Sequence, residues 1–258
     1  MATQFSRFLT DDGHSSYQFL LDPLLGSTGG TLLDLCGGSG PLSEAVEKRL
    51  GETWNIILLD ASVRELEEAR KRLRSPRVAI TNGLAQHMPL PQGACDVVIC
   101  HLAMMLMNPL DAVLNEIQRV AQPGGFFICN LLGDFESTLE REVFALFSAY
   151  EAAAARAVSW GEPAASSSAL FISRVAQAVS WAVVEERPYA VSCMTSPAQL
   201  WEFLTPFFQV QYLIEPHYRR ELKRRFLHIA TEHAGEQGLV RFSIPLVRLV
   251  FRTANPLK

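Results

Sequence analysis

Short apolar runs alternate with amphipathic stretches along the first half of the chain. Apolar, β-branched runs predict buried strands, whereas apolar positions that recur every three or four residues predict helices. The expected strands are residues 31–35, 54–60, 78–81, 95–101 and 126–132, and the expected helices are residues 41–50, 63–73 and 109–121. This alternation requires a parallel sheet with helices on both faces and right-handed crossovers.

The flanking segments depart from this repeat. Residues 1–30 carry apolar positions at helical spacing and predict an N-terminal helical cap over the site. Residues 136–195 contain two helical patterns, 136–157 and 170–184, around a weak segment at 161–169. We interpret them as an inserted helical lid, because an insertion after the fifth strand can close over a ligand.

The last section, residues 196–258, returns to the core. It predicts a helix at 196–204 and strands at 207–215 and 246–252, with a long basic helix inserted between the two strands. Residues 31–135 therefore form the centre of an α/β fold, and the later strands complete its sheet.

The stretch from Thr31 to Ser43 joins the first strand to the first helix through a glycine cluster. Gly37, Gly38 and Gly40 follow the strand directly, and glycine lets a backbone take left-handed angles while a ligand lies against it. We therefore expect this turn to bind a ligand at the helix N-terminus.

Composition narrows the choice of partner. The chain has 258 residues, 48% hydrophobic and 19% charged, with a net charge of −4, so no global basic field favours nucleic acid. The acidic N-terminus does not resemble a signal peptide, and no apolar stretch reaches the length of a membrane span. The five cysteines lack metal-type spacing. We expect a cytoplasmic protein without a membrane partner or a metal site, and with buried free thiols.

Polar residues end several of the predicted strands. Asp60 lies at the tip of the second strand, twenty positions after Gly40, where a carboxylate can accept hydrogen bonds from a ribose. Its alternative role is the N-cap of the next helix, although Ser62 can serve there instead. Asp34, Asn82 and His101 end or nearly end other strands, so the four residues are expected to converge on one crevice.

These motifs resemble those of the class I S-adenosylmethionine-dependent methyltransferases. LDLCGGSG is similar to the first family motif, LLDAS to the second and MPLPQGACDVVI to the third and fourth. EIQRVAQPGGFF is similar to the helix and turn before strand five, so the resemblance covers residues 31–132. It implies a Rossmann-like, doubly wound, mostly parallel sheet of seven strands with one antiparallel strand.

The resemblance also implies S-adenosylmethionine as the cofactor, with S-adenosylhomocysteine as its product. Asp34 and the glycine backbone would hold the methionine end, Asp60 the ribose, and Ala61 and residues 83–85 the adenine. Two residues depart from the pattern: Cys36 replaces the first glycine and Leu84 replaces the acid of the third motif, for which Asn82 is a candidate substitute. The implied cofactor residues are Tyr17, Asp34, Cys36, Gly37, Gly38, Ser39, Gly40, Asp60, Ala61, Asn82, Gly83, Leu84, Ala85 and Cys100.

A nicotinamide enzyme is the alternative, because Gly38, Gly40 and Ser43 nearly match its glycine pattern. Its pyrophosphate would lie against the helix N-terminus, close to the negative charge of Asp34. A sulfonium ligand with an ammonium group instead attracts that carboxylate. Charge therefore favours S-adenosylmethionine.

The acceptor is expected to be a small, largely apolar molecule that is methylated on O, N or C. His101 is the first candidate for a general base, and His217 and Tyr17 are further candidates that can face the pocket. A structural histidine and plain packing remain alternatives for these residues. Other hypotheses are a cofactor-retaining enzyme that catalyses a cyclisation and a non-catalytic partner protein.

One basic cluster stands apart from the acidic chain. Residues 219–225 carry five arginines and lysines beside a single glutamate, and they can receive an acidic substrate, a carrier protein or nucleic acid. A solvated helix face is the favoured interpretation. A homodimer is the other partner that we consider.

Overall fold

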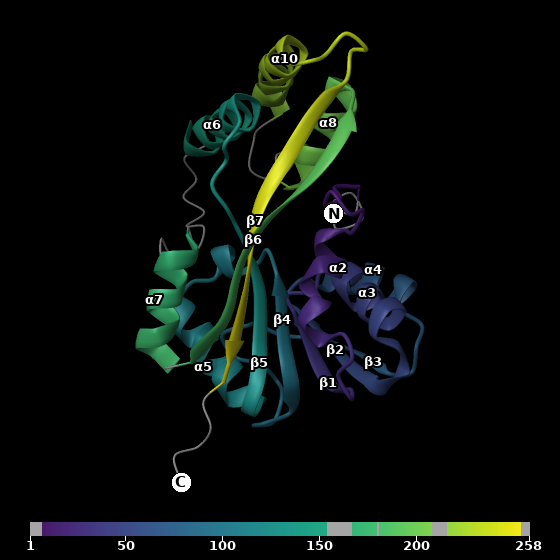
Figure 1. The fold of residues 1–258 in the computed structure, drawn as a ribbon, viewed down its shortest axis with the longest axis vertical. Coiled ribbons are helices and arrows are strands. Elements are labelled where there is room, and N and C mark those ends of the chain that lie inside the picture. Colours follow the sequence, from purple (N-terminus) through teal and green to yellow (C-terminus); the bar gives the residue numbers. More distant parts are fainter. Residues whose placement is uncertain (1–6, 154–166, 180, 208–215, 254–258) are drawn as a thin grey trace.

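The computed structural model describes residues 7–153, 167–179, 181–207 and 216–253. Its centre is a seven-stranded sheet with the order β3-β2-β1-β4-β5-β7-β6 (Figure 1). The strands are β1 (Gly30–Leu35), β2 (Trp54–Asp60), β3 (Val78–Asn82), β4 (Cys95–His101), β5 (Ala121–Leu132), β6 (Ala182–Thr195) and β7 (Val240–Arg252). The helices are α2 (Ser16–Leu20), α3 (Pro41–Leu50), α4 (Val63–Arg72), α5 (Leu110–Val120), α6 (Thr138–Ala153), α7 (Ser168–Val179), α8 (Pro197–Phe207) and α10 (Pro216–Glu232), with 3-10 turns η1 (Asp22–Leu24), η2 (Gly51–Thr53) and η3 (Met104–Leu106).

Strands β1 to β5 are parallel, and β1 and β4 lie side by side at the centre of the sheet. The chain moves outward from β1 to β3 and then crosses back to β4 and β5. Strand β7 is antiparallel to both of its neighbours. The predicted doubly wound, mostly parallel sheet with one antiparallel strand is therefore confirmed. In such a sheet, ligands bind beyond the carboxyl ends of β1 and β4, where the order reverses.

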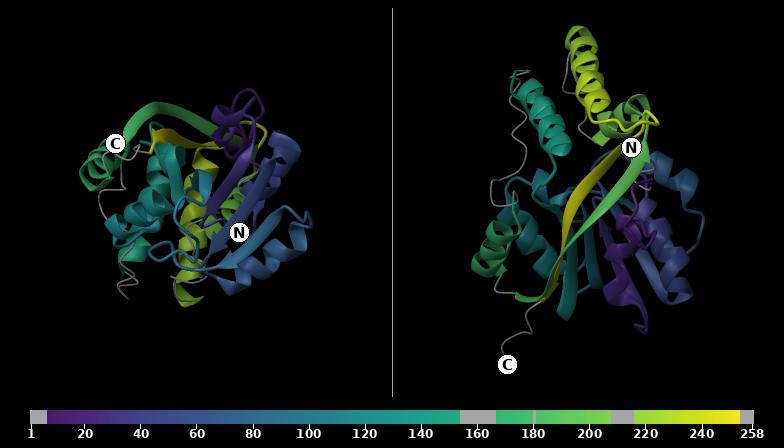
Figure 2. Two further views of the ribbon diagram at one scale, coloured as in Figure 1. Left: turned by 90° about the horizontal axis from the view of Figure 1, so that it is seen from below. Right: turned by 45° about the horizontal axis from the view of Figure 1, so that its top comes forward.

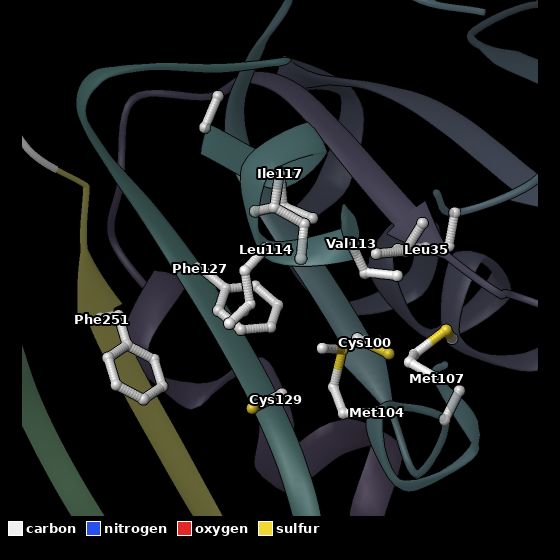
Figure 3. Close-up of a cluster of buried hydrophobic side chains, with 14 of the residues drawn as sticks. Leu35, Cys100, Met104, Met107, Val113, Leu114, Ile117, Phe127, Cys129 and Phe251 are labelled. Atoms are coloured by element: carbon white, nitrogen blue, oxygen red, sulfur yellow. The ribbon is translucent and has the colours of Figure 1, made fainter. Parts of the chain in front are cut away.

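Two apolar layers fix the helices on the sheet. Helices α5 and α7 cover one face, where Leu114, Ile117, Phe127 and Phe251 are completely buried (Figure 3). Helices α2 and α3 cover the opposite face through Leu20, Leu42 and Val46, and α4 packs beside them on β2 and β3. Each fully buried side chain of this size contributes about 1.5–3 kcal/mol. The strand tips are thereby held at fixed positions.

A further layer of helices, here called the upper layer, lies beyond the carboxyl end of β5. The pairing of β5 with β7 ends at Leu132 and Leu246, whereas β6 and β7 remain paired up to Thr195 and Val240. Helices α6, α8 and α10 gather around this extended ribbon (Figures 1 and 2). Their shared core contains Phe147, Trp201, Phe226 and Phe242. No helix among the described residues is long and apolar enough to cross a membrane.

The predicted helical lid is wrong in its second half. Residues 182–195 form strand β6, and α7 packs on α5 and against the central core. The upper layer instead combines α6 with α8 and α10, two helices that follow β6 in the chain. Of the expected strand at 207–215, Phe207 ends helix α8 and residues 208–215 lie outside the described residues, as does most of the expected linker at 161–169.

Candidate functional site

The glycine turn after β1 lies directly on a buried carboxylate. Asp34 is only 1% exposed, and its Oδ2 accepts hydrogen bonds from the backbone N–H of Ser43 at 3.0 Å and from the Ser43 hydroxyl at 2.7 Å. A Cβ atom at Gly37 would stand 2.7 Å from Cγ of Asp34, so a side chain cannot fit there. The bare backbone is therefore required for the turn to close over Asp34.

Burial controls the charge of Asp34. Removal from water raises the pKa of this carboxyl from 3.8 to about 7, the Ser43 hydrogen bonds oppose the rise, and the nearby Asp60 adds to it. Asp34 therefore lies close to its titration point at neutral pH. A cationic group placed beside it would favour the ionised form.

Asp60 ties the turn to the neighbouring strand. Its Oδ2 accepts a hydrogen bond from the Gly38 N–H at 2.9 Å, and its Oδ1 accepts one from the Ser62 N–H at 2.8 Å. The N–H of Gly37 donates to the Leu59 carbonyl at 3.2 Å. Ser62, rather than Asp60, is the N-cap of α4. This leaves the Asp60 carboxylate at the strand tip, facing the glycine turn.

A third carboxylate completes the surroundings of the turn. Gly38 has a left-handed φ of 54°, and the nearest group to its Cβ direction is Oε2 of Glu65 at 3.5 Å. Asp34, Asp60 and Glu65 thus approach the turn from β1, β2 and α4. Three carboxyl groups around a partly exposed backbone would favour a cation over a diphosphate.

Cys36 occupies a backbone position that normally belongs to glycine. Its φ is +58°, in the left-handed region, and its side chain packs against the core beneath the turn. Burial raises the pKa of both the Cys36 and the Cys100 thiols well above the ordinary value. Both thiols are therefore neutral packing groups at physiological pH.

The predicted adenine-side residues lie around the tip of β3. Nδ2 of Asn82 donates to the carbonyls of Asp60 at 3.0 Å and Ala61 at 3.1 Å, so this side chain fixes the turn after β2. A Cβ at Gly83 would meet Cδ of Pro89 at 2.8 Å. Ala85 is buried, whereas the side chain of Leu84 is 58% exposed. Leu84 therefore contributes an apolar surface rather than a polar contact.

His101, at the end of β4, contacts the N-terminal cap. Its Nε2 lies 2.8 Å from the Ser16 hydroxyl oxygen, and its ring lies 4.2 Å from the Tyr17 ring. Burial lowers the pKa of His101 to about 3, against a small opposing effect of a backbone hydrogen bond. The imidazole is neutral at physiological pH and is a weak base. Ser16 could not be identified from the sequence, because a serine at the first position of a helix carries no signal for a partner 85 positions away.

Tyr17 of α2 lies against His101, so the cap covers the end of β4. Its side chain is buried, and burial, together with the negative charge of Asp34, raises its pKa above the ordinary value, while Arg72 partly offsets this rise. The hydroxyl therefore remains protonated. A cleft of about 360 Å³ runs beside Tyr17 between α2 and α3. Of the three predicted catalytic candidates, His101 and Tyr17 are brought together, and the side chain of His217 lies outside the described residues.

The basic helix α10 lies in the upper layer. Arg224 pairs with Glu221 at 2.6 Å, and Lys223 pairs with Glu202 of α8 at 3.4 Å. These pairs partly neutralise its positive charge. A carrier-protein partner for this helix remains a prediction.

Sequence comparison identifies the central part of the chain. Residues 33–129 match the family model of the methyltransferase domain. The chain is similar to the ubiquinone/menaquinone biosynthesis C-methyltransferase UbiE of Cupriavidus pinatubonensis, with 35% identity over 99 residues. That alignment covers 38% of this chain and 41% of the relative, so the chain matches less than half of the relative's length.

Solved structures agree over a longer span. A Bacillus halodurans protein assigned to the methyltransferases has a TM-score of 0.64 at 15% identity, with 93% of this chain and 99% of that chain covered. The [4+2]-cyclase SpnF has a TM-score of 0.60 at 16% identity, with coverages of 93% and 80%. At such identities, the likeness shows the fold alone. Residues 33–129 are therefore similar to the methyltransferase domain, and the sheet around them has the fold of these solved structures.

Proposed function

We propose that this chain transfers the methyl group of S-adenosylmethionine to a small, largely apolar organic acceptor. The observation that carries the proposal is the arrangement of Asp34, Asp60 and Glu65 around the bare backbone of Gly37 and Gly38. A carboxylate-lined glycine turn suits an amino acid nucleoside with positive charge. The UbiE match supports the same chemistry.

The fit of the cofactor can be assigned residue by residue. The negative charge of Asp34, beneath the turn that closes over it, would attract the ammonium group of the methionine end. The Asp60 carboxylate would accept hydrogen bonds from the ribose hydroxyls, and Asn82 would keep that strand tip in place. When bound, the cofactor would supply a methyl carbon activated by a sulfonium sulfur.

The chain's own contribution to the reaction is mainly positioning and exclusion of water. In methyl transfer, the bond from carbon to sulfur breaks, its electron pair stays on sulfur, and the acceptor atom forms the new bond. An acceptor with a proton of high pKa must also lose that proton to a base. Tyr17 of the cap lies against His101 of β4, where the two side chains would shape the acceptor side of the pocket.

His101 remains our candidate for the proton acceptor. Because burial lowers its pKa to about 3, it is neutral and able to accept, but with little driving force. The proposal therefore suits an acceptor that is itself acidified, or one that needs no strong base. We expect His101→Ala to lower turnover while the affinity for S-adenosylmethionine changes only a few fold. Unchanged turnover in this variant would remove His101 as the base.

The acceptor atom is proposed to be carbon. The support is the C-methyltransferase name of the UbiE relative, whose alignment covers the cofactor-binding core. The apolar acceptor is supported by the name of the same relative, which places it in ubiquinone and menaquinone biosynthesis.

Mass spectrometry of the product tests this function. The chain is incubated with S-adenosylmethionine and a panel of apolar hydroxyarenes and amines, and each acceptor is examined for the gain of one methyl group. A rearranged acceptor of unchanged mass would instead favour a cofactor-retaining cyclisation, a reaction class that the shared fold of SpnF accommodates. Binding without any conversion of the panel would favour a non-catalytic partner protein.

A further inference from the structure

A row of polar residues crosses four strands beneath the cap. In the register of the sheet, His101 of β4 lies opposite Asn130 of β5, and Asn130 lies opposite Arg248 of β7. Arg248 in turn lies opposite Arg187 of β6. Paired residues of neighbouring strands project from the same face of a sheet. His101 contacts α2 on that face, so Asn130 also lies under the cap, close to the carboxyl ends of β4 and β5.

Asn130 is the residue of this row whose hydrogen bonding is incomplete. Its side chain has no exposed surface, and Nδ2 donates to the Tyr189 hydroxyl oxygen at 2.8 Å. Its Oδ1 is buried without a hydrogen-bond partner among the described residues. A buried amide oxygen left without a donor costs about 1–3 kcal/mol, so its presence calls for an explanation.

Tyr189 carries the complementary group. Because the amide nitrogen of Asn130 can only donate, the Tyr189 oxygen accepts that bond and its own hydrogen is directed elsewhere. No acceptor for that hydrogen is found in the described part of the chain. Burial keeps the Tyr189 hydroxyl protonated, because it raises its pKa far above the ordinary value. The pair therefore offers one acceptor, Oδ1 of Asn130, and one donor, the Tyr189 O–H.

The surface above this pair already holds an aromatic ring. Phe19 of α2 stacks on Tyr189 with centroids 4.0 Å apart and an interplanar angle of 26°. The guanidinium groups of Arg248 and Arg187 lie 4.4 Å and 5.1 Å from the centroid of the Phe19 ring. The position of the Phe19 ring, between Tyr189 and the two guanidinium groups, would suit another flat aromatic group, which would enter when the cap lifts and Phe19 withdraws.

We infer that Asn130 and Tyr189 bind a hydroxyl group on an aromatic acceptor substrate. A hydroxyl both donates and accepts, so it would satisfy Oδ1 of Asn130 and the Tyr189 O–H together. The pair would orient a phenol-type ring next to His101, whose strand is hydrogen-bonded to that of Asn130. This assignment rests on the proposed function, since it takes the ligand to be the methyl acceptor.

Binding of two matched arenes tests the inference without any methyl transfer. In the presence of S-adenosylhomocysteine, 1-naphthol and 1-methoxynaphthalene are titrated into the full chain by calorimetry. They share the naphthalene ring, but only 1-naphthol has a hydroxyl donor. The wild type is expected to bind 1-naphthol at least tenfold more tightly. Tyr189→Phe and Asn130→Leu are each expected to reduce this preference to less than threefold, with the affinity for 1-methoxynaphthalene unchanged.

The control is Tyr218→Phe, the same chemical change on the exposed helix α10, which should keep the full preference. If the two residues had a purely structural role, their replacement would lower the affinity for both arenes equally or for neither, and this result would overturn the inference. A wild type that binds both arenes with the same affinity would also overturn it. Tyr189→Phe decides the question alone if Asn130→Leu does not fold. A preserved hydroxyl preference without methylated product would contradict the proposed function and leave this binding site standing.

Discussion

Cys36 adopts a conformation that its side chain disfavours. Its φ of +58° belongs to the left-handed region, where a residue with a Cβ atom loses about 1–2 kcal/mol. The position lies between β1 and Gly37, whose approach to Asp34 fixes the course of the backbone. The strain is therefore maintained by the closing of the turn over the carboxylate.

Replacing Cys36 separates this strain from the packing of the thiol. We expect Cys36→Gly to be more stable than Cys36→Ala by about 1 kcal/mol, because both variants lose the sulfur and only glycine relieves the left-handed φ. The free energy of unfolding in urea measures the difference. Equal stabilities of the two variants would show that the backbone at this position carries no strain.

Asp34 makes the stability of the chain depend on pH. Its pKa is 3.8 in the unfolded chain and about 7 in the fold, so between these values the folded state binds more protons. The free energy of unfolding therefore falls as pH rises through this window, by up to about 1.4 kcal/mol per pH unit. Above pH 7 the whole destabilisation is present.

Asp34→Asn tests that dependence. The amide keeps an acceptor for Ser43 and cannot ionise, so its stability should decline less between pH 5 and pH 8 than that of the wild type. At pH 8 the variant should be as stable as the wild type or more stable. Urea titrations at several pH values provide the measurement, and parallel pH profiles would refute the raised pKa.

At the scale of elements, a buried arginine helps to fasten the cap to the sheet. Nε of Arg248 donates to Glu185 at 2.7 Å, and its NH1 donates to the Phe19 carbonyl and lies 3.6 Å from Asp22. The side chain is only 2% exposed. The position of α2, and with it of Tyr17, thus depends on β7.

Arg248→Met is expected to lower the free energy of unfolding by about 2–3 kcal/mol, because it leaves the Glu185 carboxylate and the Phe19 carbonyl without their donor. Amide hydrogen exchange in residues 16–24 should accelerate more than exchange in β2. In the control Arg252→Met, an exposed guanidinium 5.1 Å from Phe126 is lost, at a cost below about 1 kcal/mol. Uniform acceleration across the sheet would argue against a specific anchoring of the cap.

The sequence allowed the interior strands to be predicted with accurate limits, because β2 and β4 are paired on both sides and form apolar runs. Strand β6 was missed for the opposite reason. It lies at the edge of the sheet, much of it is exposed, and it contains Glu185, Glu186 and Pro188, which an edge strand tolerates.

In the candidate site, too, only part of the arrangement could be predicted from the sequence. Asp34, Asp60 and the glycines follow from motif spacing, whereas Ser16 and Tyr189 reach His101 and Asn130 only through long-range packing. No local pattern records such a contact.

At the scale of the molecule, two cores share one long ribbon. The central sheet carries the glycine turn, and the upper layer of α6, α8 and α10 is built on the extension of β6 and β7. This arrangement places a second aromatic, apolar core beyond the carboxyl end of β5.

The most direct measurement is a calorimetric titration of the whole chain with S-adenosylmethionine and, separately, with NAD, using the wild type and Asp34→Asn. We expect S-adenosylmethionine to bind to the wild type, its affinity to fall at least tenfold in Asp34→Asn, and NAD not to bind. Tight binding of NAD, or no binding of S-adenosylmethionine, would contradict the assignment of the glycine turn to a cationic ligand.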